Sequence, residues 1–373
     1  MIPADGESYD VVIVGGGPGG LSCAKNLAGS GLSVLVLEKN SALGRKICSG
    51  EISSKVMPGI NPASVFKGAQ EWKTVGVGTA KGVHNITYPR PYLWTVGRSE
   101  FETWLRSGCD GNTDVRLAEP VTKITREYVE TSGAGQVRRY KYRYLVGADG
   151  SFSTVRQFLG LPMEHIVGHA FHFILDRPSD EFRVYWLPGI FTHGYGYMMS
   201  KNKGQTMVGG AMAHVSQHTV LAPRVKDWAK KEFGIDTGKV RSEGYRGNAD
   251  YRGWKFSNGA TGNGTADKAD KSKPSIFLVG DAAGLLNPVT TEGIYYAVKS
   301  GEGVAKFLRG DVADAGRIMR RMESTHRAQV LLFDLFTDPR LPFSWFVGWL
   351  LEDPRKGVRR ILFDYVFWRF MDR

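Results

Sequence analysis

The sequence predicts an α/β protein, in which a Rossmann-like nucleotide-binding domain carries an inserted antiparallel sheet and a helical C-terminal segment. Residues 9–20 form an apolar run that leads into glycines, and residues 276–284 repeat this pattern. Between them, residues 165–214 alternate aromatic and β-branched side chains with turn residues, as antiparallel strands do. The nucleotide-binding domain is therefore expected to be discontinuous. The expected boundaries are 1–164 with 272–320 for this domain, 165–256 for a substrate-binding sheet domain, 257–271 for a flexible loop, and 321–373 for the helical segment.

The composition suits a folded chain of about two domains. Of the 373 residues, 42% are hydrophobic and 23% are charged, as in ordinary globular proteins. The three cysteines are too scattered for a disulfide framework or a zinc site, so we expect a reducing, cytoplasmic setting and no metal. The N-terminus lacks a secretory-signal pattern, and the longest apolar run is shorter than the ~20 residues that span a bilayer. The net charge of +12 indicates an anionic partner or a surface that aids solubility, and no nucleic-acid motif accompanies it.

The first motif lies between two apolar runs that predict strands, at 9–14 and 32–39. Gly15, Gly17 and Gly20 form a G-x-G-x-x-G pattern that opens a helix, where glycine allows a tight turn and close approach to a pyrophosphate. Glu38 ends the second strand, at the position where a carboxylate binds ribose hydroxyls. The unit therefore predicts a dinucleotide site for an adenosine without a 2′-phosphate.

Two further strands end in a Gly–Asp or Asp–Gly pair. Asp149 lies in VGADGSFSTVR (146–156), and Asp281 lies in LVGDAAGLLNPVTTEGI (278–294). A carboxylate at the carboxyl end of a strand faces the ligand of an open α/β sheet. Either aspartate alone could instead be a helix cap or a turn residue. The three motifs together, in this order, favour a ligand site.

In this order, the motifs resemble those of the geranylgeranyl reductase family, which belongs to the FAD-dependent flavoproteins with a hydroxybenzoate-hydroxylase-like fold. Three segments carry the resemblance: GRKICSG (44–50), GRSEFETWL (97–105) and GDAAGLLNPVTTEGIYYAVKSG (280–301). The similarity covers about residues 9–310. It implies that FAD is the cofactor.

The resemblance also implies a set of FAD contacts. Glu38 would hold the adenosine ribose, Arg98 would bring positive charge to the phosphates, and Asp281 would bind the ribitol. Val121 would lie near the adenine, and Asp149 would brace the pyrophosphate region together with Arg156. The implied cofactor-binding residues are Gly15, Gly17, Gly20, Glu38, Lys39, Arg45, Cys48, Ser49, Gly50, Arg98, Val121, Asp149, Asp281, Gly293 and Ile294. Gly293 and Ile294 would start a helix whose N–H groups face the flavin.

Cys48 has two interpretations under this resemblance. It would stand beside the flavin ring as part of the wall, or it would donate a proton as a weak catalytic residue. Arg45 and Lys46 would be available to a phosphate or to an anionic substrate.

The substrate side departs from the family pattern. The family often carries an aromatic–x–Trp–x–Phe–Pro segment, whereas this chain has YGYMMSK (195–201), with Tyr197 at the tryptophan position and no proline. Thr290 and Thr291 stand where the family has Thr-Gly. Tyr195, Tyr197 and Met199 are either candidates to line a pocket for an apolar chain or simply core residues.

The resemblance implies a reductase that saturates C=C bonds of a geranylgeranyl chain on a lipid or pigment precursor. The alternatives are a FAD monooxygenase acting on an aromatic or quinone substrate, and a prenyl-binding carrier without catalysis. Because the chain shows one dinucleotide fingerprint, NADPH would have to visit the flavin transiently, or a reduced protein such as ferredoxin would deliver the electrons.

The C-terminal residues 331–373 are dense in aromatic residues and arginine. Val358, Ile361, Leu362, Tyr365 and Trp368 fall near one helical face. Such a helix suits peripheral contact with a membrane surface, or else it packs on the nucleotide-binding domain or in a homodimer.

Overall fold

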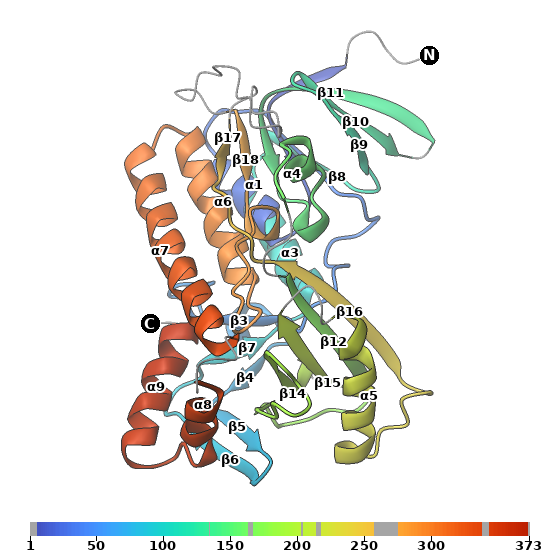
Figure 1. Ribbon diagram of the computed structural model, residues 1–373. Helices are drawn as coiled ribbons and strands as arrows, with labels where there is room; N and C mark the ends of the chain where they lie inside the picture. The colour runs from blue at the N-terminus through green and yellow to red at the C-terminus, as the bar shows by residue number, and fades with distance from the viewer. Residues whose placement is uncertain are drawn as a thin grey trace.

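The computed structural model describes residues 6–133, 135–162, 167–202, 204–213, 218–256, 275–337 and 343–371. Within these ranges the protein has two large sheets, a small third sheet, and helices packed around them (Figure 1). The predicted loop at 257–271 lies outside the described residues.

The first sheet is the nucleotide-binding sheet, with strand order β17-β18-β11-β1-β2-β8. Strand β11 pairs in parallel with β1 on one side and with β18 on the other, so the two strand-into-glycine segments share one sheet, as predicted. An antiparallel extension, β9 and β10, continues from β11. The strands are β1 (Glu7–Val14), β2 (Val34–Leu37), β8 (Thr113–Arg116), β9 (Val121–Ile124), β10 (Tyr128–Gly133), β11 (Gln136–Gly147), β17 (Lys255–Phe256) and β18 (Ile276–Leu278).

Helices cover this sheet, and α1 packs directly on α6 (Figure 1). Their backbones approach closely at Gly301, where an added Cβ would overlap the carbonyl oxygen of Gly19. The helices of this region are α1 (Pro18–Leu27), α3 (Arg98–Ser107), α4 (Thr154–Phe158), α6 (Ile294–Leu308) and α7 (Val312–Thr337).

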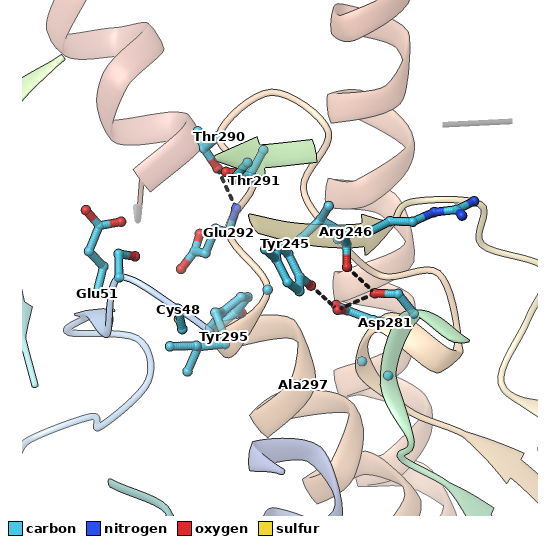
Figure 2. Close-up of a pocket in the computed structure, with 18 of the residues that line it drawn as sticks. Cys48, Glu51, Tyr245, Arg246, Asp281, Thr290, Thr291, Glu292, Tyr295 and Ala297 are labelled. Carbon is cyan, nitrogen blue, oxygen red and sulfur yellow. Dashed lines mark hydrogen bonds between the residues drawn. The ribbon is translucent and has the colours of Figure 1, made fainter. Parts of the chain in front are cut away.

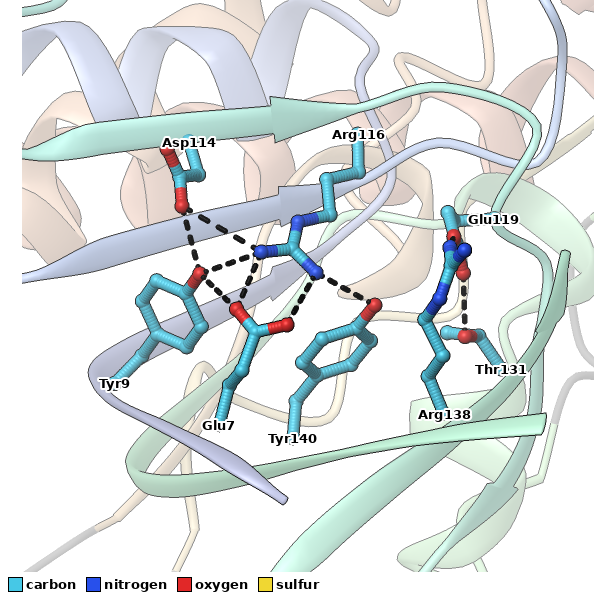
Figure 3. A network of polar contacts seen from close by, with 8 residues as sticks. All are labelled: Glu7, Tyr9, Asp114, Arg116, Glu119, Thr131, Arg138 and Tyr140. Carbon is cyan, nitrogen blue, oxygen red and sulfur yellow. Dashed lines mark hydrogen bonds and ion pairs between the residues drawn. The ribbon is translucent and has the colours of Figure 1, made fainter. Parts of the chain in front are cut away.

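A polar network ties the edge strand β8 of the first sheet to the central strands β1 and β11 (Figure 3). Tyr9 donates to Asp114 over 2.7 Å, and Arg116 donates to Tyr140 over 2.9 Å and pairs with Glu7. These side chains come from β1, β8 and β11, so the network links three strands that are distant in sequence.

The second sheet has the order β16-β12-β15-β14-β13-β5-β6. Most of its strands come from the predicted antiparallel region, but β5 and β6 come from residues 74–87, a stretch that the expected boundaries assign to the nucleotide-binding domain. Glycines interrupt the alternation in this stretch, so its residue pattern predicts strands only weakly. The strands are β5 (Thr74–Thr79), β6 (Gly82–Thr87), β12 (Val167–Leu175), β13 (Arg183–Tyr185), β14 (Gly194–Asn202), β15 (Gln205–Ala213) and β16 (Arg241–Asn248).

The two faces of the second sheet differ because successive side chains point to opposite sides. One face packs under α5 (His218–Phe233), where Phe173, Met198 and Val208 surround Trp228. The other face carries Tyr195, Tyr197 and Met199 toward a large cavity. A small sheet closes one side of this region, formed by β3 (Glu51–Ser53), β4 (Gln70–Trp72) and β7 (Leu93–Thr95) near α2 (Pro62–Val65).

The C-terminal segment is helical, as predicted, with α8 (Phe343–Glu352) and α9 (Gly357–Met371) beside β5 and β6 (Figure 1). Lys81 forms an ion pair with Glu352, and Tyr88 donates to Asp364 over 2.9 Å. Among the described residues, no helix combines the length and the apolar character needed to cross a membrane. The side chains of Tyr365 and Trp368 lie outside the described part.

Candidate functional site

A cavity of about 1830 Å³ lies between the two large sheets. It is larger than most small-molecule sites, which measure about 300–1,000 Å³, so it has room for more than one ligand. At one end it is lined by the glycine loop after β1. At the other end it is lined by the second sheet and the C-terminal helices.

The glycine loop supplies the first wall. An added Cβ at Gly17 would meet no atom within 4 Å, so this position opens directly onto the cavity. Gly15 has a φ of 110°, which only glycine adopts readily, and a Cβ there would overlap Ala148. Glu38 accepts a hydrogen bond from the Gly16 N–H over 2.8 Å, which fixes its carboxylate beside the loop. Gly20 does not line the cavity, and its role is close packing against Gly15.

Asp149 lies on the cavity wall and also caps α4. Its Oδ2 atom accepts hydrogen bonds from the N–H of Thr154 over 2.7 Å and from the Thr154 hydroxyl over 2.8 Å. Its Oδ1 atom is buried without a hydrogen-bond partner. Burial raises the pKa of this carboxyl above its usual value. Asp149 can therefore cap α4 through its Oδ2 atom and still face a ligand with its Oδ1 atom.

Arg156 does not line the cavity. Its fully buried guanidinium donates to the carbonyl oxygens of Pro162, Ala282 and Asp250, at 2.9, 3.1 and 2.7 Å. It holds three loops together behind the wall rather than facing the pyrophosphate region, which corrects the expectation from the resemblance.

Asp281 accepts several hydrogen bonds, and Figure 2 shows the one from Tyr245. Lys46 lies 2.9 Å from its Oδ2 atom, Ser151 donates over 3.1 Å, and Tyr245 donates as well. Burial alone would raise the pKa of Asp281, but the Lys46 charge and the hydrogen bonds from Tyr245, Lys46 and Ser151 outweigh burial and hold the pKa below its usual value. Lys46 is thus paired with a carboxylate of the protein itself, that of Asp281. Tyr245 carries no motif and was missed by sequence reasoning.

The loop around Cys48 forms another wall. The Cys48 thiol accepts a hydrogen bond from the Gly50 N–H over 3.3 Å. Gly50 itself does not line the cavity, but its φ of 80° and its contact with Val96 leave no room for a side chain. Arg98 lines the cavity and pairs with the buried Glu102, so part of its charge is already neutralised within the protein.

The N-terminus of α6 points its unpaired N–H groups at the same space. Gly293 is the N-cap and Ile294 the first helical residue, as predicted, and both line the cavity. A helix N-terminus carries about half a positive charge and stabilises negative charge placed before it. Most of the other predicted residues also lie on the wall: Lys39, Arg45, Ser49, Val121, Tyr195, Tyr197 and Met199.

Two further carboxyl groups, Glu51 and Glu292, also face the cavity (Figure 2). Glu51 directly follows the Cys48 loop and Glu292 lies in the 280–301 segment, but neither was among the predicted site residues. Burial raises the pKa of Glu51 to about 7, and the nearby charge of Glu292 contributes to this shift. Burial also raises the pKa of Glu292 to about 7, although Lys55 opposes the shift. One oxygen of Glu51 is buried without a hydrogen-bond partner. These carboxyls exchange protons near neutral pH.

The far end of the cavity is apolar. Tyr195 fixes one corner by donating to the carbonyl oxygen of Thr290 over 2.6 Å. The apolar lining comes from β7, from β13 and the loops beside it, and from α7, α8 and α9. It comprises Leu93, Phe182, Val184, Trp186, Phe191, Leu332, Phe333, Phe346, Val347, Leu350, Leu351 and Phe363.

A family model described as FAD binding domain matches residues 8–311. The chain belongs to this family of FAD-binding flavoproteins. FAD is therefore its cofactor, as the resemblance implied, and the protein is a FAD-dependent oxidoreductase. The fold of the first sheet is that of this family.

The residues of this FAD-family chain fit the cofactor. A phosphate of FAD would meet the open space before Gly17. A hydroxyl group would meet the unpartnered Oδ1 atom of Asp149. The electron-rich ring would meet the N-terminus of α6.

Curated relatives of this FAD-family chain include the following two proteins. Protein CbrA of Escherichia coli O6:H1 is 27% identical over 378 residues, which cover 96% of this chain and 97% of the relative. The digeranylgeranylglycerophospholipid reductase of Thermoplasma acidophilum is 24% identical over 334 residues, which cover 81% of this chain and 78% of the relative.

Solved structures show the same fold. A geranylgeranyl bacteriochlorophyll reductase-like protein from Thermoplasma acidophilum superposes with a TM-score of 0.72 at 17% identity, covering 95% of both chains. A probable FAD-dependent monooxygenase from Pseudomonas aeruginosa, pqsL, gives a TM-score of 0.65 at 18% identity, covering 91% of this chain and all of that one. At these identities the likeness concerns the fold alone.

Proposed function

We propose that this protein is a FAD-dependent reductase that saturates carbon–carbon double bonds of an isoprenoid chain on a lipid or pigment precursor. The observation that carries the proposal is the continuity of one cavity. Its polar end is built by the glycine loop, Asp149 and Asp281, and its other end is lined by apolar side chains from the second sheet and the C-terminal helices. An elongated apolar chain suits such a space, because its length can lie in the apolar end while one double bond reaches the cofactor.

FAD, once reduced, supplies a hydride for the alkene. The protein residues do the rest. Gly15, Gly17 and Glu38, which line the cavity, would hold the adenosine and pyrophosphate part, and the N-terminus of α6 would favour negative charge in front of Gly293. Aromatic side chains such as Phe182 and Trp186 exclude water from the apolar end. Water exclusion and alignment matter because an isolated alkene is a poor hydride acceptor.

The electron donor is part of the same proposal. The chain carries one G-x-G-x-x-G fingerprint, so NADPH reduces the flavin by a transient visit, or a ferredoxin-type protein does so at the surface. Anaerobic mixing of the oxidised protein with each donor, followed by flavin absorbance, separates the two.

The test is anaerobic turnover. Dithionite-reduced protein is incubated with a lipid bearing geranylgeranyl chains, and the product is analysed by mass spectrometry. The proposal expects masses that rise in steps of two hydrogens without oxygen. A product that gains an oxygen atom, and only in air, would instead establish the monooxygenase alternative. The structural similarity to the probable monooxygenase pqsL motivates this alternative. Bound substrate that returns unchanged under both conditions would indicate the carrier alternative.

A further inference from the structure

A single row of residues crosses four strands of the second sheet. Tyr197 on β14 lies opposite Gly209 on β15, Gly209 lies opposite His172 on β12, and His172 lies opposite Glu243 on β16. An added Cβ at Gly209 would overlap the Cβ of His172. The glycine therefore lets the tyrosine and histidine side chains meet across the strand that separates them.

The row is joined by hydrogen bonds. The Tyr197 hydroxyl lies 2.9 Å from Nδ1 of His172, and Nε2 of His172 lies 3.4 Å from Oε2 of Glu243. Lys201 donates to the same Glu243 oxygen over 2.9 Å, and Arg241 donates to the other oxygen. The chain of contacts thus has three links between a tyrosine and two cations.

The two ends of the row lie in different surroundings. Tyr197 and His172 are buried, with 5% and 3% of their surfaces exposed, and both line the cavity. At the other end, the Arg241 side chain is 63% exposed, so Glu243 is one contact away from solvent. The row therefore leads from the cavity wall to the outside of the sheet.

The charges along the row are compatible with proton movement. Hydrogen bonds from His172, Lys201 and Arg241 hold the pKa of Glu243 far below its usual value, so Glu243 is a carboxylate at neutral pH. Burial raises the pKa of Tyr197 well above its usual value, and the nearby Tyr195, Glu51 and Cys48 act in the same direction, so the phenol keeps its proton until a partner accepts it. A carboxylate at Nε2 orients the imidazole and leaves Nδ1 facing the phenol.

We propose that Tyr197, His172 and Glu243 form a proton relay that carries a proton from solvent to the substrate in the cavity, with Tyr197 as the final donor. This inference rests on the proposed reductase function. The π bond of the alkene breaks as one carbon gains a hydride from reduced FAD and the other gains the Tyr197 proton. His172, as an imidazolium held by the Glu243 carboxylate, gives its Nδ1 proton to the tyrosine oxygen and becomes a neutral imidazole. Between turnovers the imidazole takes up a proton from solvent, so each turnover consumes one solvent proton. FAD is oxidised in this step, and the electron donor of the proposed function reduces it again.

The row also has a simpler interpretation, in which the hydrogen bonds only stiffen the sheet. The two interpretations differ in what the variants change. A stiffening role affects folding and cofactor content, whereas a relay affects the rate of proton transfer and its dependence on solvent isotope. Loss of a general acid slows a reaction by about 10²–10⁴-fold.

The experiment uses the full-length, FAD-loaded protein in anaerobic single turnovers with a geranylgeranyl lipid, in H₂O and in D₂O. We expect Tyr197→Phe and Glu243→Gln to bind FAD normally but to form product about a hundredfold more slowly, with an enlarged solvent isotope effect. Tyr185→Phe is the matched control, because Tyr185 is equally buried but points to the opposite face, against Trp228. Imidazole NMR provides a second readout in the protein without substrate. The His172 nitrogen signals are expected to shift in Tyr197→Phe and in Glu243→Gln but not in Tyr185→Phe.

Three results would overturn the relay. Variants that keep the wild-type rate and isotope effect would remove it while leaving the reductase function intact. If the His172 nitrogen signals shift in neither Tyr197→Phe nor Glu243→Gln, the three side chains of the row are not coupled. A wild-type protein that reduces no chain would remove the proposed function, and the relay with it. If Tyr197→Phe fails to fold, Glu243→Gln decides alone, since this residue lies near the solvent end of the row.

Discussion

Glu51 and Glu292 bring two carboxyl groups to one buried wall, and their electrostatics link the site to stability. Each has a pKa of about 7 in the folded protein, compared with about 4.3 for an unperturbed glutamate. The folded state therefore binds protons more tightly than the unfolded chain. This contribution to stability is complete below about pH 4.3 and is lost as the pH rises through 7.

We expect the double variant Glu51→Gln/Glu292→Gln to be more stable than the wild type at pH 8, by about 3–4 kcal/mol per carboxyl. At pH 4.5 the two proteins should unfold at nearly the same urea concentration, because a protonated carboxyl and an amide are both neutral. The control is Glu127→Gln, at an exposed position. An equal gain at both pH values would contradict the assignment of raised pKa values.

A variant of Cys48 tests whether this residue only shapes the cavity wall or also donates a proton. As a wall residue, its thiol contributes shape rather than a proton, so Cys48→Ala should keep bound FAD and lose less than about tenfold in turnover, well below the 10²–10⁴-fold expected for a lost acid. Flavin absorbance and anaerobic turnover measure the two. A hundredfold loss with full FAD content would instead make Cys48 the proton donor.

A variant of Gly17 tests the cofactor-binding end of the cavity. The Gly17 backbone has extended angles that valine tolerates, and its missing side chain opens onto the cavity. Gly17→Val should therefore fold but weaken FAD binding by about tenfold or more, which corresponds to about 1.4 kcal/mol. Flavin retained after gel filtration gives the readout. Gly111→Val, also unobstructed but away from the cavity, should retain FAD, and equal retention in both variants would contradict the placement of the cofactor.

At the scale of elements, α8 and α9 have a double role. Leu350 and Phe363 face the cavity, whereas Val358 and Ile361 on α9 are 65% and 69% exposed. Apolar side chains that face solvent next to a lipid-sized cavity support the proposal of a peripheral membrane contact, through which an isoprenoid lipid could enter.

Vesicle flotation checks that contact. Val358→Ser/Ile361→Ser should reduce binding of the full chain to vesicles containing anionic lipid, because two apolar side chains no longer enter the interface. The control is Ile60→Ser/Val65→Ser, which removes two exposed apolar side chains from another region. Equal flotation of the three proteins would disprove a role for α9.

Leu350 gives a test of the cavity itself. Leu350→Trp places extra volume in the apolar end, where 3% of the leucine is exposed. We expect turnover of a geranylgeranyl substrate to fall, while a shorter prenyl analogue keeps its rate, because only the long chain reaches that end. Leu331→Trp, at a 62% exposed position on α7, is the control. The same loss for both chain lengths would show that the apolar end does not hold the chain.

For the whole molecule, the sequence predicted the nucleotide-binding half better than the rest. Gly15, Gly17, Glu38 and Asp281 could be found because each motif is short and its residues are neighbours in the chain. Tyr245 could not, because it reaches the cavity only when distant strands pair, and nothing local marks it. Glu51 directly follows the GRKICSG segment, but the burial that raises its pKa arises only in the fold. The same holds for His172 and Glu243, whose contact depends on strand register.

The second sheet also sets the order in which the chain can fold. Strands β5 and β6 are made early in synthesis, yet β5 pairs with β13, which follows about a hundred residues later. Their outer contacts wait even longer, since Lys81 and Tyr88 find their partners Glu352 and Asp364 near the end of the chain. Until those residues leave the ribosome, the apolar face that this hairpin shares with Leu350 and Phe363 stays uncovered. Expression and aggregation of this protein should therefore be especially sensitive to changes in its last helices, even where those changes leave the cofactor site untouched.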